Sequence, residues 1–167
     1  MLLNTVSLKN MKSIFKTTND YTGLILRLTI ALVLFPHGAQ KLLGWFGGYG
    51  FIGTMQFFTD TRGLPWLVGF LVIIIEFFGS LLLLLGMGSR ILAAGVAVLS
   101  IGIILTSHLQ YGFFMNWFGN QNGEGYEYFL LLIGVSIALL INGSGKLSVD
   151  KLLSNKLNFK EQQLKRK

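Results

Sequence analysis

Hydrophobic residues are concentrated in four long stretches, separated by short polar or glycine-rich segments. The stretches cover residues 21–43, 64–87, 91–109 and 126–141. A helix needs roughly 20 apolar residues to cross about 30 Å of hydrocarbon, and each stretch is close to that length. The alternating segments of about ten residues that a membrane β-barrel needs are absent from the sequence. The pattern therefore predicts an all-α polytopic membrane protein, a bundle of four transmembrane helices.

The segments between and beyond these stretches predict how the helices are arranged. Only residues 86–90 link the second stretch to the third, so these two helices should form a tight antiparallel hairpin. We expect the transmembrane domain to cover residues 21–143, after a basic segment at 1–20 that can form an interfacial helix. Residues 144–167 form a basic tail with apolar residues at helical spacing, which predicts an amphipathic helix on the inner leaflet. These apolar residues are Val149, Leu152, Leu153 and Leu157.

The composition agrees with a membrane protein and predicts its orientation. Hydrophobic residues make up 52% of the chain and charged residues 13%, about half the charged share of a soluble domain. The formal net charge is +7 at pH 7, but the basic residues cluster in the terminal segments and the 86–90 turn. They are better explained by membrane topology and anionic lipid headgroups than by nucleic acid. Both termini are predicted to be cytoplasmic, in a multi-pass protein of the inner (plasma) membrane.

The two loops expected on the outer side are rich in glycine and aromatic residues rather than plainly polar. They cover residues 44–63 and 109–125. One interpretation is an aromatic belt at the membrane interface. The alternative is a lid over a cavity between the helices, in which glycine permits tight or re-entrant backbone.

Two charged residues lie well inside the apolar stretches. A charge in hydrocarbon is costly unless it is paired or hydrated, so each one is a candidate functional residue. Counted from Asp20 at 1.5 Å per residue, Arg27 lies about 10 Å deep, and Glu76, counted from Gly86, lies about 15 Å deep. We therefore predict a buried ion pair, Arg27–Glu76, that holds the bundle together.

A second polar group is expected near the outer ends of the helices. His37 and His108 lie about 25 Å and 27 Å along the first and third stretches, and Glu127 begins the fourth at the same level. Because three helices bring these side chains to one depth, His37, His108 and Glu127 are candidate catalytic residues. Three neighbouring residues are candidates for binding a ligand: Lys41, Gln40 and Glu124.

Two histidines beside a carboxylate can exchange protons near neutral pH. Such a group could bind and protonate a quinone-like or phenolic headgroup that enters from the bilayer. It could also ligate a metal ion or hold a haem between His37 and His108, or the side chains could simply satisfy one another at a helix end. The chain has no cysteine, which excludes disulfides, thiol chemistry and Cys-ligated iron–sulfur clusters. It also lacks a nucleophile triad, a phosphate-binding loop and a dinucleotide fingerprint.

These residues belong to a series of short motifs that covers residues 21–153. The motifs are Arg27, His37-Gly38-x-Gln40-Lys41, Glu76-Phe-Phe-Gly79 followed by Gly86 and Arg90, His108-x3-Gly112-Phe-Phe114, Glu124-Gly-Tyr-Glu127, and Gly143-Ser-Gly145-Lys-Leu-Ser148-Val-Asp150. In order and spacing, the series resembles the DoxX family of small four-helix membrane proteins. The resemblance implies a membrane subunit of a redox system, because the family is named after a component of a thiosulfate–quinone oxidoreductase.

The leading hypothesis is a membrane component of a quinone-linked oxidoreductase system that binds a quinone or similar aromatic molecule near its outer face. His37, His108 and Glu127 would handle protons and Lys41 would hold an anionic oxygen. A partner protein or a bound cofactor would supply electrons, because the chain has no evident redox centre of its own. The alternatives are a non-enzymatic scaffold of a redox complex and a small-molecule transporter. Glycines in the second and third stretches also permit close helix contacts, within one chain or in a homo-oligomer.

Overall fold

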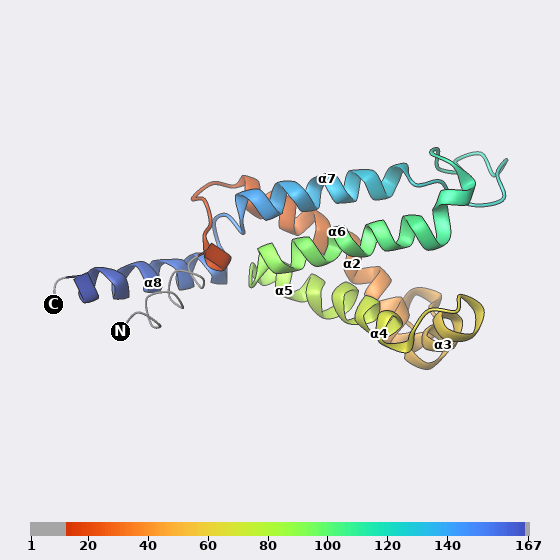
Figure 1. Cartoon of the computed structure of the whole chain (residues 1–167), viewed down its shortest axis with the longest axis horizontal. Helices are drawn as coiled ribbons and strands as arrows, with labels where there is room; N and C mark the ends of the chain where they lie inside the picture. Colours follow the sequence, from red (N-terminus) through yellow and green to blue (C-terminus); the bar gives the residue numbers. More distant parts are fainter. Residues whose placement is uncertain (1–12, 166–167) are drawn as a thin grey trace.

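A computed structural model describes residues 13–165 of the chain, apart from the side chains of Lys160, Leu164 and Lys165. Every regular element within this range is a helix (Figure 1). Three helical segments are long and apolar enough to cross a membrane. The prediction of an all-helical, polytopic membrane protein is therefore confirmed. Most of the interfacial helix predicted for residues 1–20 lies outside the described residues.

The long helical segments correspond to the apolar stretches of the sequence. They are α2 (Thr22–Leu43), a continuous segment Trp66–Leu85 and a third segment Ser89–Tyr111. The fourth stretch forms α7 (Glu127–Asn142), which has 16 residues, fewer than the roughly 20 that span hydrocarbon. The number of four spans and the cytoplasmic position of the termini therefore stay predictions.

Short π-helical turns interrupt the second and third segments. In chain order these segments consist of α4 (Trp66–Ile74), the π turn η3 (Ile75–Gly79), α5 (Ser80–Leu85), α6 (Ser89–Ile103), the π turn η4 (Ile104–His108) and the 3-10 turn η5 (Leu109–Tyr111). Between α5 and α6, Gly86 and Gly88 adopt positive φ angles of 64° and 68°, which glycine tolerates without strain. The two segments are thus joined by the short turn that the sequence predicts.

The end of the bundle opposite α8 (Val149–Lys165) is called the outer end below, after its predicted orientation. The first connection at this end, between α2 and α4, is itself largely helical. It contains the 3-10 turn η1 (Trp45–Gly47), helix α3 (Gly50–Gln56) and the π turn η2 (Phe57–Thr61). The second outer connection, residues 112–126, has no regular helix. Both connections lie at the end of the bundle opposite α8 (Figure 1).

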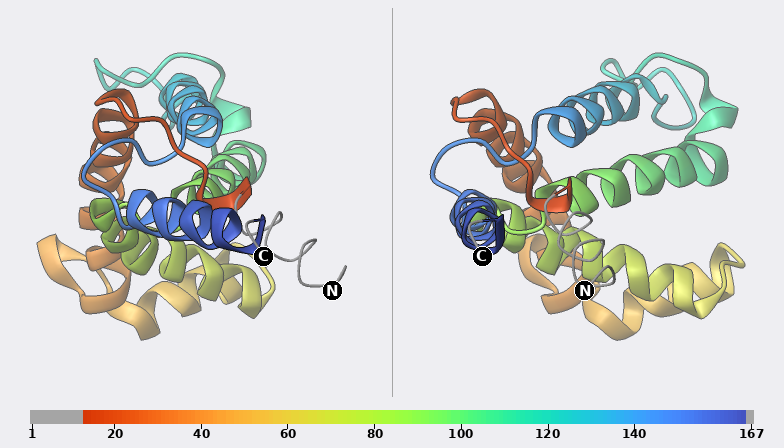
Figure 2. Two further views of the ribbon diagram at one scale, coloured as in Figure 1. Left: turned by 90° about the vertical axis from the view of Figure 1, so that its left-hand side faces the viewer. Right: turned by 60° about the vertical axis from the view of Figure 1, so that its left-hand side comes forward.

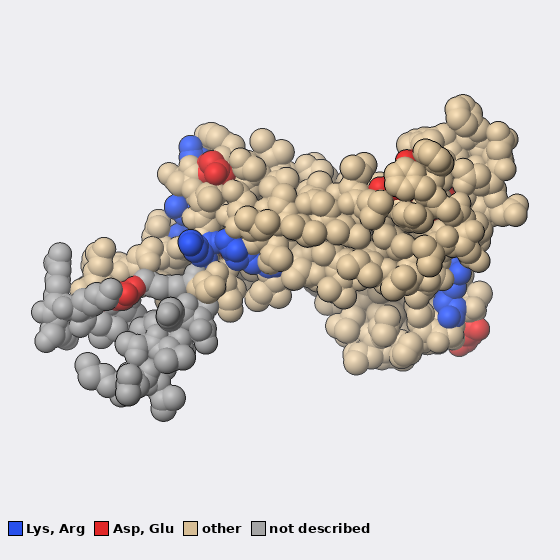
Figure 3. Space-filling view, turned by 45° about the horizontal axis from the view of Figure 1, so that its top comes forward, with Lys and Arg blue, Asp and Glu red and all other residues tan. Residues whose placement is uncertain are grey.

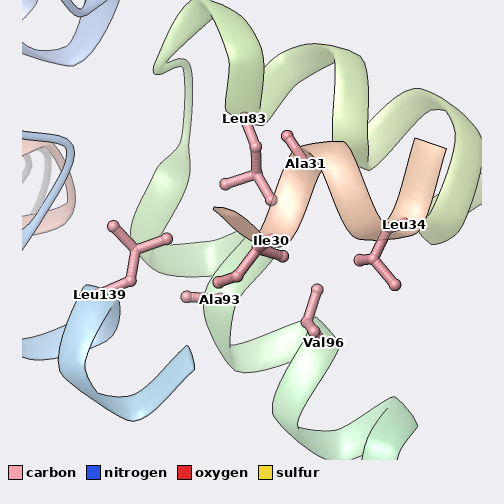
Figure 4. Packing of buried hydrophobic residues seen from close by; sticks show 7 residues of the cluster. All are labelled: Ile30, Ala31, Leu34, Leu83, Ala93, Val96 and Leu139. Atoms are coloured by element: carbon pink, nitrogen blue, oxygen red, sulfur yellow. The ribbon is translucent and has the colours of Figure 1, made fainter. Parts of the chain in front are cut away.

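The helices pack tightly at one end of the bundle and separate toward the other. At the end near the 86–88 turn, buried side chains from α2, α5, α6 and α7 form the hydrophobic core (Figure 4). The core residues are Ile30, Ala31, Leu34, Leu83, Ala93, Val96 and Leu139. Beyond them α6 stays packed along α7, while α4 and α6 diverge (Figure 2).

The guanidinium group of Arg27 joins separate parts of the chain at the packed end. Arg27 is 1% exposed. It donates hydrogen bonds to the carbonyl oxygens of Leu83 and Leu84 at the end of α5, and to those of Ser144 and Leu147 after α7. The last carbonyls of a helix have no complete set of partners within the helix, so Arg27 adds a buried donor to the end of α5 and to the segment after α7.

The predicted ion pair between Arg27 and Glu76 is wrong. The depth count misjudged how far α2 is shifted along its axis relative to the hairpin. Counting from Asp20 and from Gly86 assumed that these two residues lie at one level. Arg27 itself is level with the turn: a Cβ added to Gly86 would be 3.1 Å from its guanidinium carbon. Glu76 lies about 15 Å farther along the hairpin, where it meets Lys41 instead.

Asp150, near the start of α8, makes a second buried link at the packed end. Its carboxylate accepts hydrogen bonds from the backbone N–H groups of Gly88 (2.7 Å) and Ser89 (3.0 Å) and from the hydroxyl of Ser144. A carboxylate at the first N–H groups of α6 is also favoured by the helix dipole. Asp150 therefore fastens the beginning of α8 to the hairpin turn, and α8 extends away from the bundle (Figure 1).

Charged side chains lie toward the two ends of the molecule on the face in Figure 3, and the long middle part of that face carries none. Lys and Arg gather toward the end where α8 begins. An uncharged middle suits the hydrocarbon core of a bilayer, and a basic end is typical of the cytoplasmic side. The position of α8 on the inner leaflet stays a prediction.

Replacing Arg27 with lysine should destabilise the folded protein. A single ammonium group cannot reach both the α5 carbonyls and those after α7, so buried acceptors lose their donor. We expect a loss of about 2–4 kcal/mol in the free energy of unfolding, since a hydrogen bond to a charged group contributes about 1.5–3 kcal/mol. Thermal unfolding in detergent would measure it. Arg62→Lys, at an exposed position, is the matched control, and equal melting temperatures for the two variants would contradict this role of Arg27.

Candidate functional site

A cavity of about 920 Å³ lies in the outer half of the bundle, between the diverging helices α4 and α6. Its walls also include parts of α2, η2, α7 and the loop before α7. Most of the lining side chains are apolar. The ionisable lining residues are His37, Lys41, Arg62, Glu76, His108, Glu124 and Tyr128. The size and the mixed lining are those of a small-molecule site.

An ion pair between Lys41 and Glu76 lies on the wall of this cavity. Lys41 Nζ is 2.5 Å from Glu76 Oε2, and the two side chains are 25% and 5% exposed. Gly38, almost one turn before Lys41, lets α2 approach η3 closely: a Cβ at Gly38 would be 2.5 Å from the backbone nitrogen of Phe77. The close approach of the two backbones therefore brings the Lys41 ammonium group to the buried carboxylate.

All three π-helical turns of the described residues contribute to the cavity wall. The residues that they contribute are Phe57 and Phe58 from η2, Ile75 and Glu76 from η3, and Thr106, Ser107 and His108 from η4. A π turn inserts an extra residue and frees a backbone carbonyl, and such turns are frequent at functional sites. Their convergence on one cavity indicates that the distortion of the helices shapes this site.

Hydroxyl side chains accompany each of the three π turns. Thr59 donates to the carbonyl oxygen of Met55 at 3.0 Å, Ser80 to that of Phe77 at 2.7 Å, and Thr106 to that of Gly102 at 2.8 Å. Such hydrogen bonds to the preceding turn bend helices and satisfy carbonyls that the main chain leaves free. Sequence analysis missed the π turns.

His108 is held in a defined orientation at the outer end of the cavity. Its Nδ1 is 2.8 Å from the backbone carbonyl oxygen of Glu124, and its ring centroid lies 4.7 Å from that of Phe129. A carbonyl oxygen only accepts hydrogen bonds, so Nδ1 is the protonated nitrogen. In the neutral imidazole Nε2 is then an acceptor, which leaves that nitrogen for a ligand.

The two acidic residues near the start of α7 organise the outer loop. Glu127 Oε1 accepts a hydrogen bond from the backbone N–H of Met115 at 2.9 Å, and Glu124 Oε2 accepts one from that of Asn116 at 2.7 Å. Glu124 lines the cavity, but Glu127 is not among its lining residues. The Glu127 carboxylate is therefore engaged with the loop.

The structure brings part of the predicted site together. His37, His108, Lys41 and Glu124 line one cavity, although they come from α2, η4 and the second outer connection. Gln40 lies outside the lining, and its side-chain amide donates to the carbonyl oxygen of Phe46 at 3.3 Å. The predicted grouping thus holds for four of the candidates, while Glu127 and Gln40 support the surrounding loops.

Two further ionisable residues that line the cavity were missed by sequence analysis. Tyr128 directly follows Glu127 in the sequence, so its hydroxyl group could have been expected at the same depth as the predicted site. Arg62 is a cation in an outer loop, where the positive-inside rule disfavours one, and its guanidinium carbon lies 5.4 Å from the ring centroid of Phe57. A cation in a loop predicted to lie on the outer side was the signal that could have singled out Arg62.

The alternative of a metal centre gains no support from the geometry. Within residues 13–165, no cluster of three or more His, Cys, Asp or Glu side chains could hold a metal ion.

Comparison with known proteins places this site in a family. The DoxX family model matches residues 22–109, which is more than half of the chain. The chain belongs to the DoxX family. The resemblance noted in the sequence is thereby confirmed, and the matched range includes Arg27, the Lys41–Glu76 pair and both histidines.

Two relatives cover most of the chain. It is 33% identical over 127 residues to a Bacillus subtilis protein named "Putative oxidoreductase CatD", a match that spans 76% of this chain and 83% of the relative. It is also 33% identical over 141 residues to the inner membrane protein YqjF of Escherichia coli, spanning 84% of this chain and 98% of the relative. No solved structure matches the chain.

Substituting Gly38 with alanine should disrupt the contact that positions the ion pair. The added methyl group would lie 2.5 Å from the backbone of Phe77, and backbone cannot move aside as a flexible side chain can. We expect a loss of about 1–3 kcal/mol in the free energy of unfolding, the usual cost of overpacking, measured by thermal unfolding in detergent.

The matched control is Gly134→Ala in α7, where an added Cβ has no atom within 4 Å. There alanine should be neutral or slightly stabilising, because it favours the helix. Similar melting temperatures for the Gly38 and Gly134 variants would show that the contact is not tight.

Proposed function

We propose that this DoxX-family membrane protein binds a quinone or similar aromatic molecule in the cavity, as a membrane component of a quinone-linked oxidoreductase system in the plasma membrane. The observation that carries the proposal is the cavity of about 920 Å³, apolar over most of its wall, with ionisable groups at its outer end and a Lys41–Glu76 ion pair about halfway along the hairpin. A lipid-soluble ring with polar oxygens needs such surroundings.

The ionisable residues suit a ring that carries carbonyl or hydroxyl oxygens. The Lys41 ammonium group is a donor, and its contact with Glu76 Oε2 at 2.5 Å holds it in place. His108 Nε2, left free by the hydrogen bond from Nδ1 to the Glu124 carbonyl oxygen, can accept a hydrogen bond from a ring hydroxyl. His37 lines the same cavity and is exposed, so it can exchange protons with the outer surface.

These residues account for binding and for protons, not for electrons. Reduction of a quinone needs two electrons and two protons, and a chain without cysteine cannot supply electrons from thiols or from a Cys-ligated cluster. A partner protein or a bound cofactor therefore acts as the electron donor in this proposal. The word oxidoreductase in the name of the Bacillus relative supports a redox role, and the name of the Escherichia relative supports the inner membrane.

Replacing His108 with alanine should abolish binding of a quinone ring, because it removes the proton donor and acceptor at the outer end. We expect at least a tenfold loss of affinity for a benzoquinone without a tail, titrated by tryptophan fluorescence in lipid nanodiscs. Gln110→Ala is the control, since Gln110 is exposed and does not line the cavity. Unchanged affinity in a folded His108→Ala variant would refute the proposal for this residue.

Protein purified from its native membrane should carry a lipid-soluble aromatic compound. Absorption spectroscopy, metal analysis and organic extraction followed by mass spectrometry would detect it. A stoichiometric quinone is the expected result. A stoichiometric haem or metal ion in its place would overturn the proposal and favour ligation of that group by His37 and His108.

A further inference from the structure

We infer that the cavity takes an amphiphile, whose ring lies at the outer end and whose apolar tail passes between α4 and α6 into the bilayer. This inference rests on the proposed function. It adds the class of ligand, a tailed quinone or phenol, and the route by which the ligand enters.

The lining of the cavity changes from polar to apolar along the α6–η4 wall, from His108 back toward Gly95. On α6 and η4, the lining residues Val98, Gly102 and Thr106 follow one another at intervals of four, about 6 Å apart along the axis, and His108 comes next. The polar groups therefore begin one turn beyond Gly102, and the wall before Gly102 on this segment is apolar apart from Ser100. Ser100 donates its hydroxyl hydrogen bond to its own helix, at the carbonyl oxygen of Val96.

The apolar part of the wall reaches the surface of the molecule between α4 and α6. Val98 on α6 is 69% exposed, and Val68 and Leu71 on α4 are 42% and 45% exposed, although all three line the cavity. Val98 lies roughly 14 Å along α6 from its first residue, near the middle of a hydrocarbon layer of about 30 Å. The opening therefore extends from the outer end of α4, at Val68, to mid-depth on α6, at Val98, and its exposed wall residues are apolar.

This arrangement matches how an amphiphile lies in a membrane leaflet. Its polar ring lies near the interface and its tail points toward the middle of the bilayer. Along α6 and η4 the cavity has the same order, with Thr106 and His108 at one end and the exposed Val98 near mid-membrane. The Lys41–Glu76 pair lies on the facing wall at the level of Gly95, where Ile75 approaches α6. A ring without a tail could enter from the outer surface and would need no opening at that depth.

Two glycines of α6 leave room for a tail along the same wall. A Cβ added to Gly102 has no atom within 4 Å, and one added to Gly95 meets only Cδ1 of Ile75, at 3.7 Å. Both glycines line the cavity. A bulky side chain at Gly102 would therefore fit without displacing the backbone, and it would separate the polar end from the opening.

The experiment compares one benzoquinone ring in two forms, without a tail and with a ten-carbon tail. Affinities for protein in lipid nanodiscs are calculated from the ligand concentration within the bilayer. The different partitioning of the two forms between water and lipid then does not affect the comparison. In Gly102→Phe the affinity for the tailed form should fall at least tenfold, while that for the tail-free ring stays within threefold of the parent. Gly134→Phe, on the open face of α7, should change neither.

The outcomes separate this inference from the proposed function. If Gly102→Phe weakens both forms equally or weakens neither, or if the parent binds only the tail-free ring, the tail does not use this route and the inference is overturned. Binding of the ring would still support the proposed function. If the parent binds neither form, the proposed function fails, and the inference fails with it.

Photo-crosslinking tests the path directly, and it does not depend on how well phenylalanine fills the opening. A quinone with a diazirine at the end of its tail should label residues of α4 or α6, as mapped by mass spectrometry. Labelling confined to α7 or to the outer loops would contradict the inference. A photoreactive phospholipid serves as the control: if it labels the same residues equally and the quinone does not compete, the opening holds only a membrane lipid and the inference is overturned.

Discussion

The guanidinium group of Arg27 holds the packed end of the bundle, and the positions of the other helices depend on it. A buried arginine is tolerated there because its N–H groups meet carbonyl oxygens at the end of α5 and after α7, so that few polar groups are left unpaired. Asp150 completes the arrangement on the N–H groups of the hairpin turn. Two polar contacts thus join α2, α5, α6 and α8.

The fixed end explains why the other end is open. Helices in a membrane gain little from apolar contact, because lipid chains are as apolar as the side chains. The small core around Ile30 and Val96 lies close to the polar links, and beyond it α4 and α6 diverge. The π turns η3 and η4 distort the same two segments where they face the cavity. The cavity therefore lies where α4 and α6 separate, while α2 stays close to η3 and α6 stays packed along α7.

The polarity of the cavity connects this architecture with redox chemistry. The Lys41–Glu76 pair and His108 place polar groups inside a mostly apolar wall, where such groups are costly, so each is a candidate functional residue. Membership of the DoxX family and the oxidoreductase name of one relative agree with this use. In this view the chain supplies the binding site and the protons, while electrons come from elsewhere.

The apolar stretches alone predicted the helical segments, because the backbone of a helix in lipid satisfies its own hydrogen bonds and its length follows from the thickness of the membrane. They also singled out Arg27, His37, Lys41, Glu76 and His108, since polar groups in hydrocarbon stand out in a sequence. The partners of these residues depended on the tertiary structure. Helical rise measures distance along one helix, but it cannot give the offset between two helices. The Arg27–carbonyl contacts and the close approach at Gly38 set that offset, and they pair Lys41, rather than Arg27, with Glu76.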